Sequence, residues 1–168
     1  MTGIPHDQAY IAKLWAHPRL CLALFGIQFH TPEGRHRYDE AGIQAELDLA
    51  LAEAIQEGIL LQNRAMETSE GPVLLQYWTS YDDLDNWARS LPHSRWWKWL
   101  LDNTGPELSF YHEIYQAKTA EAIFEKGCKP VGPAVFCDVM IAHGGEGRSK
   151  ERQQRFAEAA ALHSAPRD

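Results

Sequence analysis

The sequence predicts an α+β fold of the ferredoxin-like type, with the element order β-α-β-β-α-β. Three observations predict it. Between residues 19 and 142, segments with strand periodicity alternate with two helical segments in that order. The first strand segment is apolar on both faces, which is typical of a strand inside a sheet. The 168 residues, of which 45% are hydrophobic, suffice for one such core with peripheral extensions.

The first half of this domain is expected to be a strand, a loop and a helix. Leu20–Phe29 is the strand, because both alternating sets of its side chains are apolar. Thr31–Arg37 is expected as a loop, since it contains proline and glycine. Asp39–Gln56 is expected as a helix, because apolar residues recur at every fourth position and Gly58 is placed to end it.

A hairpin and a second helix are expected next. Ile59–Met66 and Val73–Thr79 have strand character and are separated by turn residues. Ser80 begins a pattern that resembles a capping box, and it opens a helix. Pro92 ends or bends that helix, because a proline cannot donate the next backbone hydrogen bond.

The segment that starts at Pro92 is rich in aromatic residues. Its sequence, PHSRWWKWLL, holds one histidine and three of the six tryptophans of the chain. Its polar residues fall on one stripe, so we expect a short helix that contacts protein or ligand over most of its surface. Leu108–Ala117 is the next strand. One of its faces should hold Phe110, His112 and Ile114, and the other Tyr111, Glu113 and Tyr115.

The two ends of the chain are expected to extend this domain. Residues 1–18 should form an arm with one helical turn near 9–15, of a kind that wraps a partner subunit. Thr119–Gly127 is expected as a short helix and Ala134–Ile141 as a last strand. Residues 143–168 start with a glycine linker and continue as a polar tail, either a frayed helix or disordered. The expected division is therefore an arm (1–18), an α+β domain (19–142) and a tail (143–168).

Composition excludes several classes of function. The net charge of −7 disfavours broad binding to nucleic acid or to an anionic membrane, because both need a surplus of Lys and Arg. The longest apolar run is too short for a transmembrane helix, and the N-terminus lacks the pattern of a signal peptide. The three cysteines include no CxxC pair and fit reduced thiols in the cytoplasm.

The expected sheet also predicts an assembly. A four-stranded sheet with helices on one face leaves its other face bare. Because the first strand is apolar on both sides, we expect a second copy of the chain to cover that face. The expected assembly is a homodimer in which two sheets close into a barrel.

The segment Leu74–Gln116 resembles the DUF4188 family. The resemblance rests on a spaced set of aromatic and histidine residues: Tyr77-Trp78, Ser80, Leu84, Trp87-Ala88-Arg89, His93, Trp97 and His112-Glu113-Ile114-Tyr115. The segment covers about a quarter of the chain, and Phe110-Tyr111 departs from the family's usual Ile-Trp. This family is similar to dimeric α+β barrel proteins that are labelled monooxygenase-like. The wider superfamily includes cofactor-free monooxygenases and cyclases as well as haem-dependent aldoxime dehydratases.

The resemblance implies roles for particular residues. In the aldoxime dehydratases a helical histidine binds haem iron, and a histidine on the following strand assists proton transfer at a similar spacing. By that resemblance His93 would bind the iron of haem b beside Trp97, and His112 would be the catalytic acid or base. An apolar small-molecule substrate would lie in a pocket lined by further aromatic residues, for which we take Trp78, Phe110 and Tyr115.

Other interpretations of the same residues stay open. A dry pocket without metal, with His112 moving a proton, suits a cofactor-independent monooxygenase or cyclase of a biosynthetic pathway. The pocket also suits a small-ligand binding protein without turnover. In the plainest interpretation the protein is a structural dimer, His112 is a core histidine, and His93 only shapes the turn after Pro92.

Overall fold

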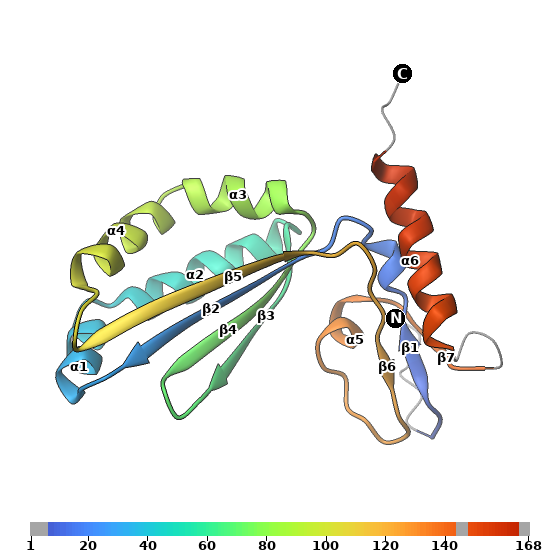
Figure 1. The fold of residues 1–168 in the computed structure, drawn as a ribbon, viewed down its shortest axis with the longest axis horizontal. Helices are drawn as coiled ribbons and strands as arrows, with labels where there is room; N and C mark the ends of the chain where they lie inside the picture. The colour runs from blue at the N-terminus through green and yellow to red at the C-terminus, as the bar shows by residue number, and fades with distance from the viewer. Residues whose placement is uncertain (1–6, 144–147, 165–168) are drawn as a thin grey trace. The chain divides into compact units, whose positions relative to one another are not determined.

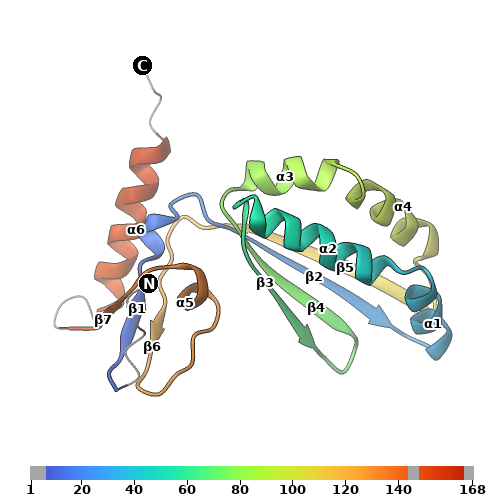
Figure 2. The ribbon, with the colours of Figure 1, turned by 180° about the vertical axis from the view of Figure 1, so that it is seen from behind.

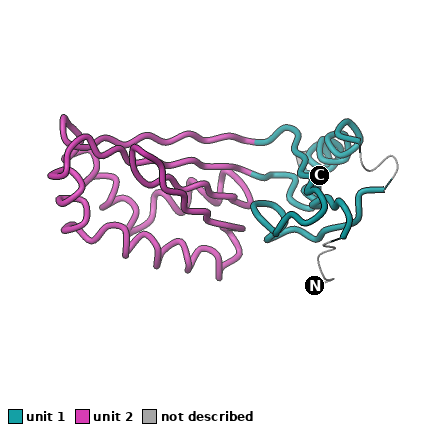
Figure 3. The backbone as a smooth tube through the Cα atoms, turned by 90° about the horizontal axis from the view of Figure 1, so that it is seen from below, with its two compact units in different colours: residues 1–20, 117–168 teal, residues 21–116 magenta. Residues whose placement is uncertain are grey.

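The computed structural model describes residues 7–143 and 148–164. The chain divides into two compact units (Figure 3). Unit 2 is the continuous segment Cys21–Gln116, and unit 1 joins Met1–Leu20 to Ala117–Asp168. The sequence suggested an arm, a domain and a tail with boundaries at 18 and 142. The division differs because strands near both ends of the chain pair with each other.

Unit 2 contains one antiparallel sheet of four strands. In chain order these are β2 (Cys21–Phe29), β3 (Leu60–Glu67), β4 (Pro72–Trp78) and β5 (Leu108–Gln116). Their order in the sheet is β3-β4-β2-β5, so β2 is an interior strand, as its two apolar faces predict. Helices lie between β2 and β3 and between β4 and β5. The ferredoxin-like α+β fold expected from the sequence is therefore confirmed.

The helices of unit 2 lie on one face of this sheet (Figures 1 and 2). They are α1 (Pro32–Glu40), α2 (Ile43–Gln56), α3 (Tyr81–Arg89) and α4 (His93–Asn103). The core of the unit forms between these helices and the sheet. Its largest fully buried side chain is that of Trp78, which contacts Trp87 of α3 with 5.1 Å between ring centroids. No helix of unit 2 covers the other face.

The region between β2 and β3 differs from the prediction. Thr31–Arg37 is not a loop: Thr31 caps α1 by accepting a hydrogen bond from the Gly34 amide (3.2 Å), and Pro32 occupies the first helical position. Both features favour a helix start, and the sequence interpretation gave them too little weight. Gly42, in the left-handed conformation (φ 66°), separates α1 from α2. Gly58 (φ 75°) follows the end of α2, as predicted.

The predicted helix starts around α3 and α4 are confirmed. Ser80 caps α3 by accepting a hydrogen bond from the Asp83 amide (3.1 Å). Pro92 separates α3 from α4, which begins at His93. Glu46 of α2 holds α4 in place, because its carboxylate pairs with Arg95 and accepts a hydrogen bond from the indole of Trp96 (2.8 Å). The tryptophan-rich helix is therefore fixed against both α2 and the sheet.

Unit 1 contains a second sheet, in the order β6-β1-β7. The strands are β1 (Tyr10–Ala12), β6 (Ile123–Phe124) and β7 (Val139–Ile141), and the helical elements are η1 (Leu14–Ala16), α5 (Pro133–Phe136) and α6 (Ser149–Ser164). Three predictions change here. The arm supplies the central strand of a sheet, Thr119–Gly127 contains β6 instead of a helix, and Ala134–Ile141 is divided between α5 and β7. The short strands β6 and β7 both pair with β1. This partner is far away in the sequence, so local periodicity does not reveal it.

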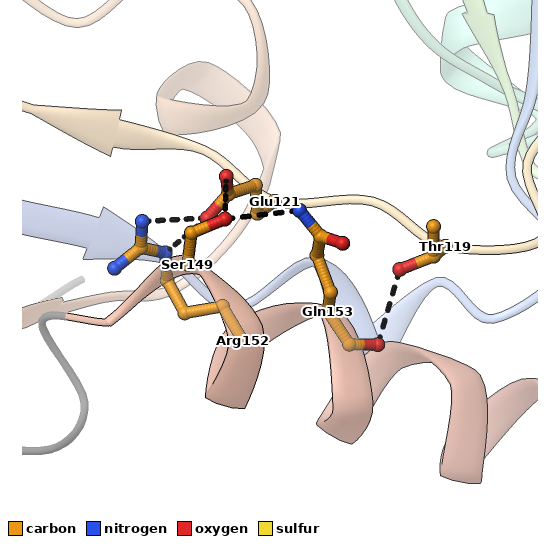
Figure 4. A network of polar contacts seen from close by, with 5 residues as sticks. All are labelled: Thr119, Glu121, Ser149, Arg152 and Gln153. Atoms are coloured by element: carbon orange, nitrogen blue, oxygen red, sulfur yellow. Dashed lines mark hydrogen bonds and ion pairs between the residues drawn. The ribbon is translucent and has the colours of Figure 1, made fainter.

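The helical alternative for the C-terminal tail is confirmed by α6. A polar network binds this helix to the segment 119–121 (Figure 4). Glu121 accepts hydrogen bonds from Ser149 (2.6 Å) and from the buried Arg152 (2.7 Å), and Thr119 donates to the Gln153 carbonyl (3.1 Å). The glycine link 144–147 lies outside the described residues. Within the described part, no helix has the length and apolar character that crossing a bilayer requires.

Candidate functional site

A cavity of about 630 Å³ lies in unit 2 between the helical layer and the sheet. Its walls come from α2, α3 and α4, and its floor from β2, β4 and β5. Most of its lining is apolar, and a few polar side chains project into it. This size and composition are typical of sites for small organic molecules. Three predicted site residues line it: His93, Trp97 and His112.

His93 is the first residue of α4 and is held in a defined orientation. Its Nδ1 lies 2.8 Å from the backbone carbonyl of Ala88, which can only accept a hydrogen bond. Nδ1 therefore carries a proton, and in the neutral ring Nε2 keeps its lone pair. The ring packs against Trp87, with 4.8 Å between centroids. Burial lowers the pKa of His93, outweighing the hydrogen bond to Ala88, and the nearby His112 lowers it further, so the neutral imidazole is favoured.

Trp97 lies one turn along α4 from His93, and its ring contacts both histidines. Its ring is nearly parallel to that of His93, with 6.3 Å between centroids, and meets the ring of His112 edge-on at 5.1 Å. The residues share a site because positions four apart lie on the same face of a helix, and that face packs against β5. The structure thus brings both predicted histidines to one cavity, with an indole in contact with both.

His112 is on β5, on the face that points to the helices, opposite Phe25 of β2. It is the more exposed of the two histidines. Within the described part of the chain, neither of its ring nitrogens makes a hydrogen bond. An imidazole at a cavity with free nitrogens is placed to exchange a proton with a bound molecule. His112 therefore has the freedom that an acid or base needs.

The structure places the other three predicted pocket residues elsewhere. Phe110 packs edge-on against Trp97, at 5.0 Å, and supports it from outside the cavity lining. Trp78 is fully buried behind the lining. Tyr115 is 56% exposed and donates a hydrogen bond to Glu113 (2.5 Å) on the opposite face of β5. Strand alternation explains this last result, because Tyr115 and His112 are an odd number of residues apart.

Sequence reasoning missed two polar features of the cavity. Gln76 is buried on β4 and lines the cavity floor. A signal for it was present, since Gln76 is the polar member of the otherwise apolar set Leu74, Gln76 and Trp78. Asp85 and Arg89 of α3 also line the cavity and form an ion pair of 2.8 Å with each other. Their four-residue spacing gives no sign of which face of α3 points inward.

The residues present fit a cofactor that needs one histidine from the protein. Among the described residues, no group of three His, Cys, Asp or Glu side chains is arranged to hold a metal ion. Haem iron needs only one protein ligand, and His93 offers a neutral imidazole whose Nδ1–H is fixed by a backbone carbonyl. The apolar walls of the cavity suit a flat macrocycle. His93 and Trp97 are the residues that would hold it.

Comparison with known families identifies most of the chain. Residues 21–132 fit the family described as Monooxygenase af470-like, which is more than half of the chain. The match includes all of unit 2 and therefore the whole cavity. This result confirms the monooxygenase-like family expected from the histidine and aromatic pattern. No curated protein matches the sequence.

Several solved structures resemble the fold. An aldoxime dehydratase is 17% identical, with a TM-score of 0.58 over 93% of this chain and 45% of its own. A second aldoxime dehydratase, in complex with butyraldoxime, is 20% identical, with a TM-score of 0.54 over 95% of this chain and 45% of its own. This chain thus spans less than half of the length of these two proteins. SnoaB, a cofactor-independent oxygenase from Streptomyces nogalater, is 10% identical, with a TM-score of 0.43 over 61% of this chain and 96% of its own.

Proposed function

Because this chain belongs to the Monooxygenase af470-like family, we propose that it is a small-molecule enzyme whose reaction takes place in the cavity of unit 2. The observation that carries the proposal is that His93, Trp97 and His112 line one mostly apolar cavity. The two imidazoles differ in their hydrogen bonding. Nδ1 of His93 is fixed by a backbone carbonyl, whereas the ring of His112 makes no hydrogen bond within the described residues. A fixed, neutral histidine suits a ligand, and a free one suits proton transfer.

Our first candidate is a haem-dependent lyase or oxidoreductase acting on an apolar substrate. His93 would hold the iron of haem b through Nε2, because Nδ1 is engaged by Ala88. Bound haem would supply a Lewis-acidic, redox-active iron. Trp87 and Trp97 would keep water away from His93, since their rings pack against it. We place the protein in the cytoplasm in this proposal, because its three cysteines are unpaired.

For this candidate we propose an aldoxime as the first substrate to test. Dehydration of butyraldoxime, the ligand bound by one of the similar structures, gives butyronitrile and water. The reaction needs a proton delivered to the leaving hydroxyl oxygen and another removed from carbon. His112 would exchange these protons at a ring nitrogen, since its imidazole lines the cavity without a hydrogen-bond partner in the described part.

Titration of the purified protein with hemin tests this candidate. We expect a Soret band typical of histidine-bound haem, and we expect His93→Ala to weaken binding by about 10–100-fold or more, since even an outer partner of a metal ligand is worth that much. His36→Ala is the matched control, because His36 is exposed on α1 and pairs with Glu40. A hemin spectrum that the wild-type protein does not change would contradict the haem proposal. Equal affinity of His93→Ala and the wild type for hemin would contradict it too.

The second candidate is a cofactor-independent monooxygenase or cyclase. The free imidazole of His112 at an apolar cavity favours it, together with the description of the family. In this reaction His112 would remove a proton from an acidic carbon, and the stabilised carbanion would react with O₂. Anthrone is a suitable probe, because its acidic CH₂ lies between two aromatic rings and oxidation by O₂ gives anthraquinone and water. Anthraquinone formation without hemin, absent in His112→Ala, would support this candidate over the first.

We also propose that the protein is a homodimer. Its interface would be the face of the unit 2 sheet that no helix of unit 2 covers. Cross-strand neighbours on this face include Leu24 beside Leu75. A sheet face of this kind is favourable to cover, and a second copy of the chain offers a matching one. Light scattering after size exclusion is expected to give twice the 19.1 kDa of one chain.

Leu75→Glu is expected to shift this mass to that of one chain, because it places a charge on the proposed interface. Leu49→Glu is the matched control, since Leu49 is 68% exposed on α2. A wild-type protein that remains at the mass of one chain at 50 µM would contradict the dimer.

A further inference from the structure

Gln76 is the buried polar residue of the cavity floor that the proposed reaction does not use. Its orientation is defined by its neighbour Trp78, whose indole Nε1 lies 3.1 Å from Oε1 of Gln76. An indole N–H can only donate, so the oxygen of the amide must face Trp78. The NH₂ group of Gln76 therefore points away from Trp78.

The NH₂ group of Gln76 is available to a ligand. Within the described residues, Nε2 of Gln76 makes no hydrogen bond. It is also not one of the fully buried polar atoms that lack a partner, so it keeps some accessible surface. Since Gln76 lines the cavity and is only 5% exposed overall, the accessible surface of Nε2 belongs to the cavity. Asn63 lies opposite Gln76 on β3 and has an unpartnered Oδ1, but no hydrogen bond joins the two. The donor is thus fixed in direction and unused.

The sheet register places this donor relative to the histidines. Gln76, Ala23 and Ile114 form one row across the sheet, and Leu74, Phe25 and His112 form the next row on the same face. Gln76 and His112 are thus two strands apart and one row apart, or about 12 Å between Cα atoms. Ala23 lies between the two outer residues of the first row, and its small side chain leaves room on the floor.

We propose that Gln76 is a specificity-determining residue that binds a hydrogen-bond acceptor of the substrate, such as a carbonyl oxygen, at the end remote from His112. This inference rests on the proposed function of the cavity and specifies the substrate class: an apolar molecule with one acceptor oxygen. A donor in an apolar cavity favours a ligand that has an acceptor, because a ligand without it leaves the donor desolvated and unpaired. Trp78 acts as a positioning residue, since it prevents the amide from turning its oxygen into the cavity.

Two probes of nearly the same shape test the proposal. 2-Acetylnaphthalene carries a carbonyl oxygen where 2-isopropenylnaphthalene carries a CH₂ group. The dissociation constants of both are measured by equilibrium dialysis for the wild type and for Gln76→Met, which keeps the length of the side chain and removes the donor. The difference in hydration of the two probes is the same for every variant. The ratio of the two constants, compared between variants, therefore isolates the contribution of Gln76.

We expect the preference for the ketone to fall about fivefold in Gln76→Met, the value of one ordinary hydrogen bond. Gln56→Met is the matched control, because Gln56 is an exposed residue at the end of α2, and its preference should equal that of the wild type. An unchanged ratio in Gln76→Met, with both probes bound, overturns the role of Gln76 and leaves the cavity as the binding site. If neither probe binds the wild type, both the role of Gln76 and the proposed function of the cavity are wrong.

A measurement on the unmodified protein removes the dependence on the folding of Gln76→Met. In wild-type protein labelled with ¹⁵N-glutamine, the side-chain amide signals of Gln76 should move when the ketone is added and stay in place with the alkene at equal occupancy. Equal shifts with both probes would contradict a hydrogen bond from Gln76 to the carbonyl.

Discussion

Replacing Trp78 by alanine is expected to lower the free energy of unfolding of unit 2 by about 3–5 kcal/mol, the usual cost of removing a fully buried tryptophan. Trp78 is 0% exposed and packs against Trp87, so its removal leaves a cavity between β4 and α3. It also leaves Oε1 of Gln76 without its donor. Both effects act in the same direction, because an unfilled space and an unpaired buried oxygen each destabilise the folded state.

Urea unfolding followed by tryptophan fluorescence measures this loss. Five of the six tryptophans lie in unit 2, so the signal remains strong in Trp78→Ala and reports mainly on that unit. Leu91→Ala is the control, since Leu91 is 79% exposed, and it should stay within about 0.5 kcal/mol of the wild type. A loss below 1 kcal/mol in Trp78→Ala would show that the packing around this residue is not tight.

Replacing His112 by alanine is expected to lower kcat of the proposed dehydration by about 10²–10⁴-fold, the usual contribution of a positioned acid or base. Hemin binding should be retained, because the proposed ligand is His93 and not His112. The separation of the two effects distinguishes proton transfer from cofactor binding. Formation of the nitrile is followed by gas chromatography, with hemin in the ferric state and, after dithionite, in the ferrous state.

Two outcomes of this assay would contradict the assignment. If His112→Ala keeps the wild-type kcat, the imidazole of His112 does not move the proton. If hemin binding is lost together with turnover, His112 holds the cofactor or the fold around it. His36→Ala serves again as the control, and the variant is expected to match the wild type in both measurements.

Local sequence patterns predicted unit 2 well for a physical reason. Each of its strands is long enough to show alternation, and its helices carry caps such as Ser80 that act within three or four residues. The exception, α1, is a helix of low overall hydropathy whose start at Thr31 and Pro32 depends on the same local rules. In unit 1 the strands have only two or three residues. Such segments form through pairing with distant partners, and periodicity cannot identify them.

The candidate site was predictable in part for similar reasons. His93 and Trp97 follow from helix spacing, and His112 follows from strand alternation next to the packed helix. Tyr115 was placed in the pocket against that alternation, and the structure puts it on the other face of β5. The donor role of Gln76 depends on a side-chain hydrogen bond to Trp78, two residues along the same strand face. A sequence gives the residue types of such a pair and not the direction of the amide.

The first and last residues of unit 2, Cys21 and Gln116, are direct neighbours on adjacent strands. The chain thus enters and leaves this unit at the same point of the sheet. A module with adjoining ends can be inserted into, removed from or duplicated within a longer polypeptide without disturbing its own strand order. The architecture of unit 2 is therefore suited to transfer between proteins as a complete module during evolution. A circularly permuted version of unit 2 should preserve its hydrogen-bonded strand pairs.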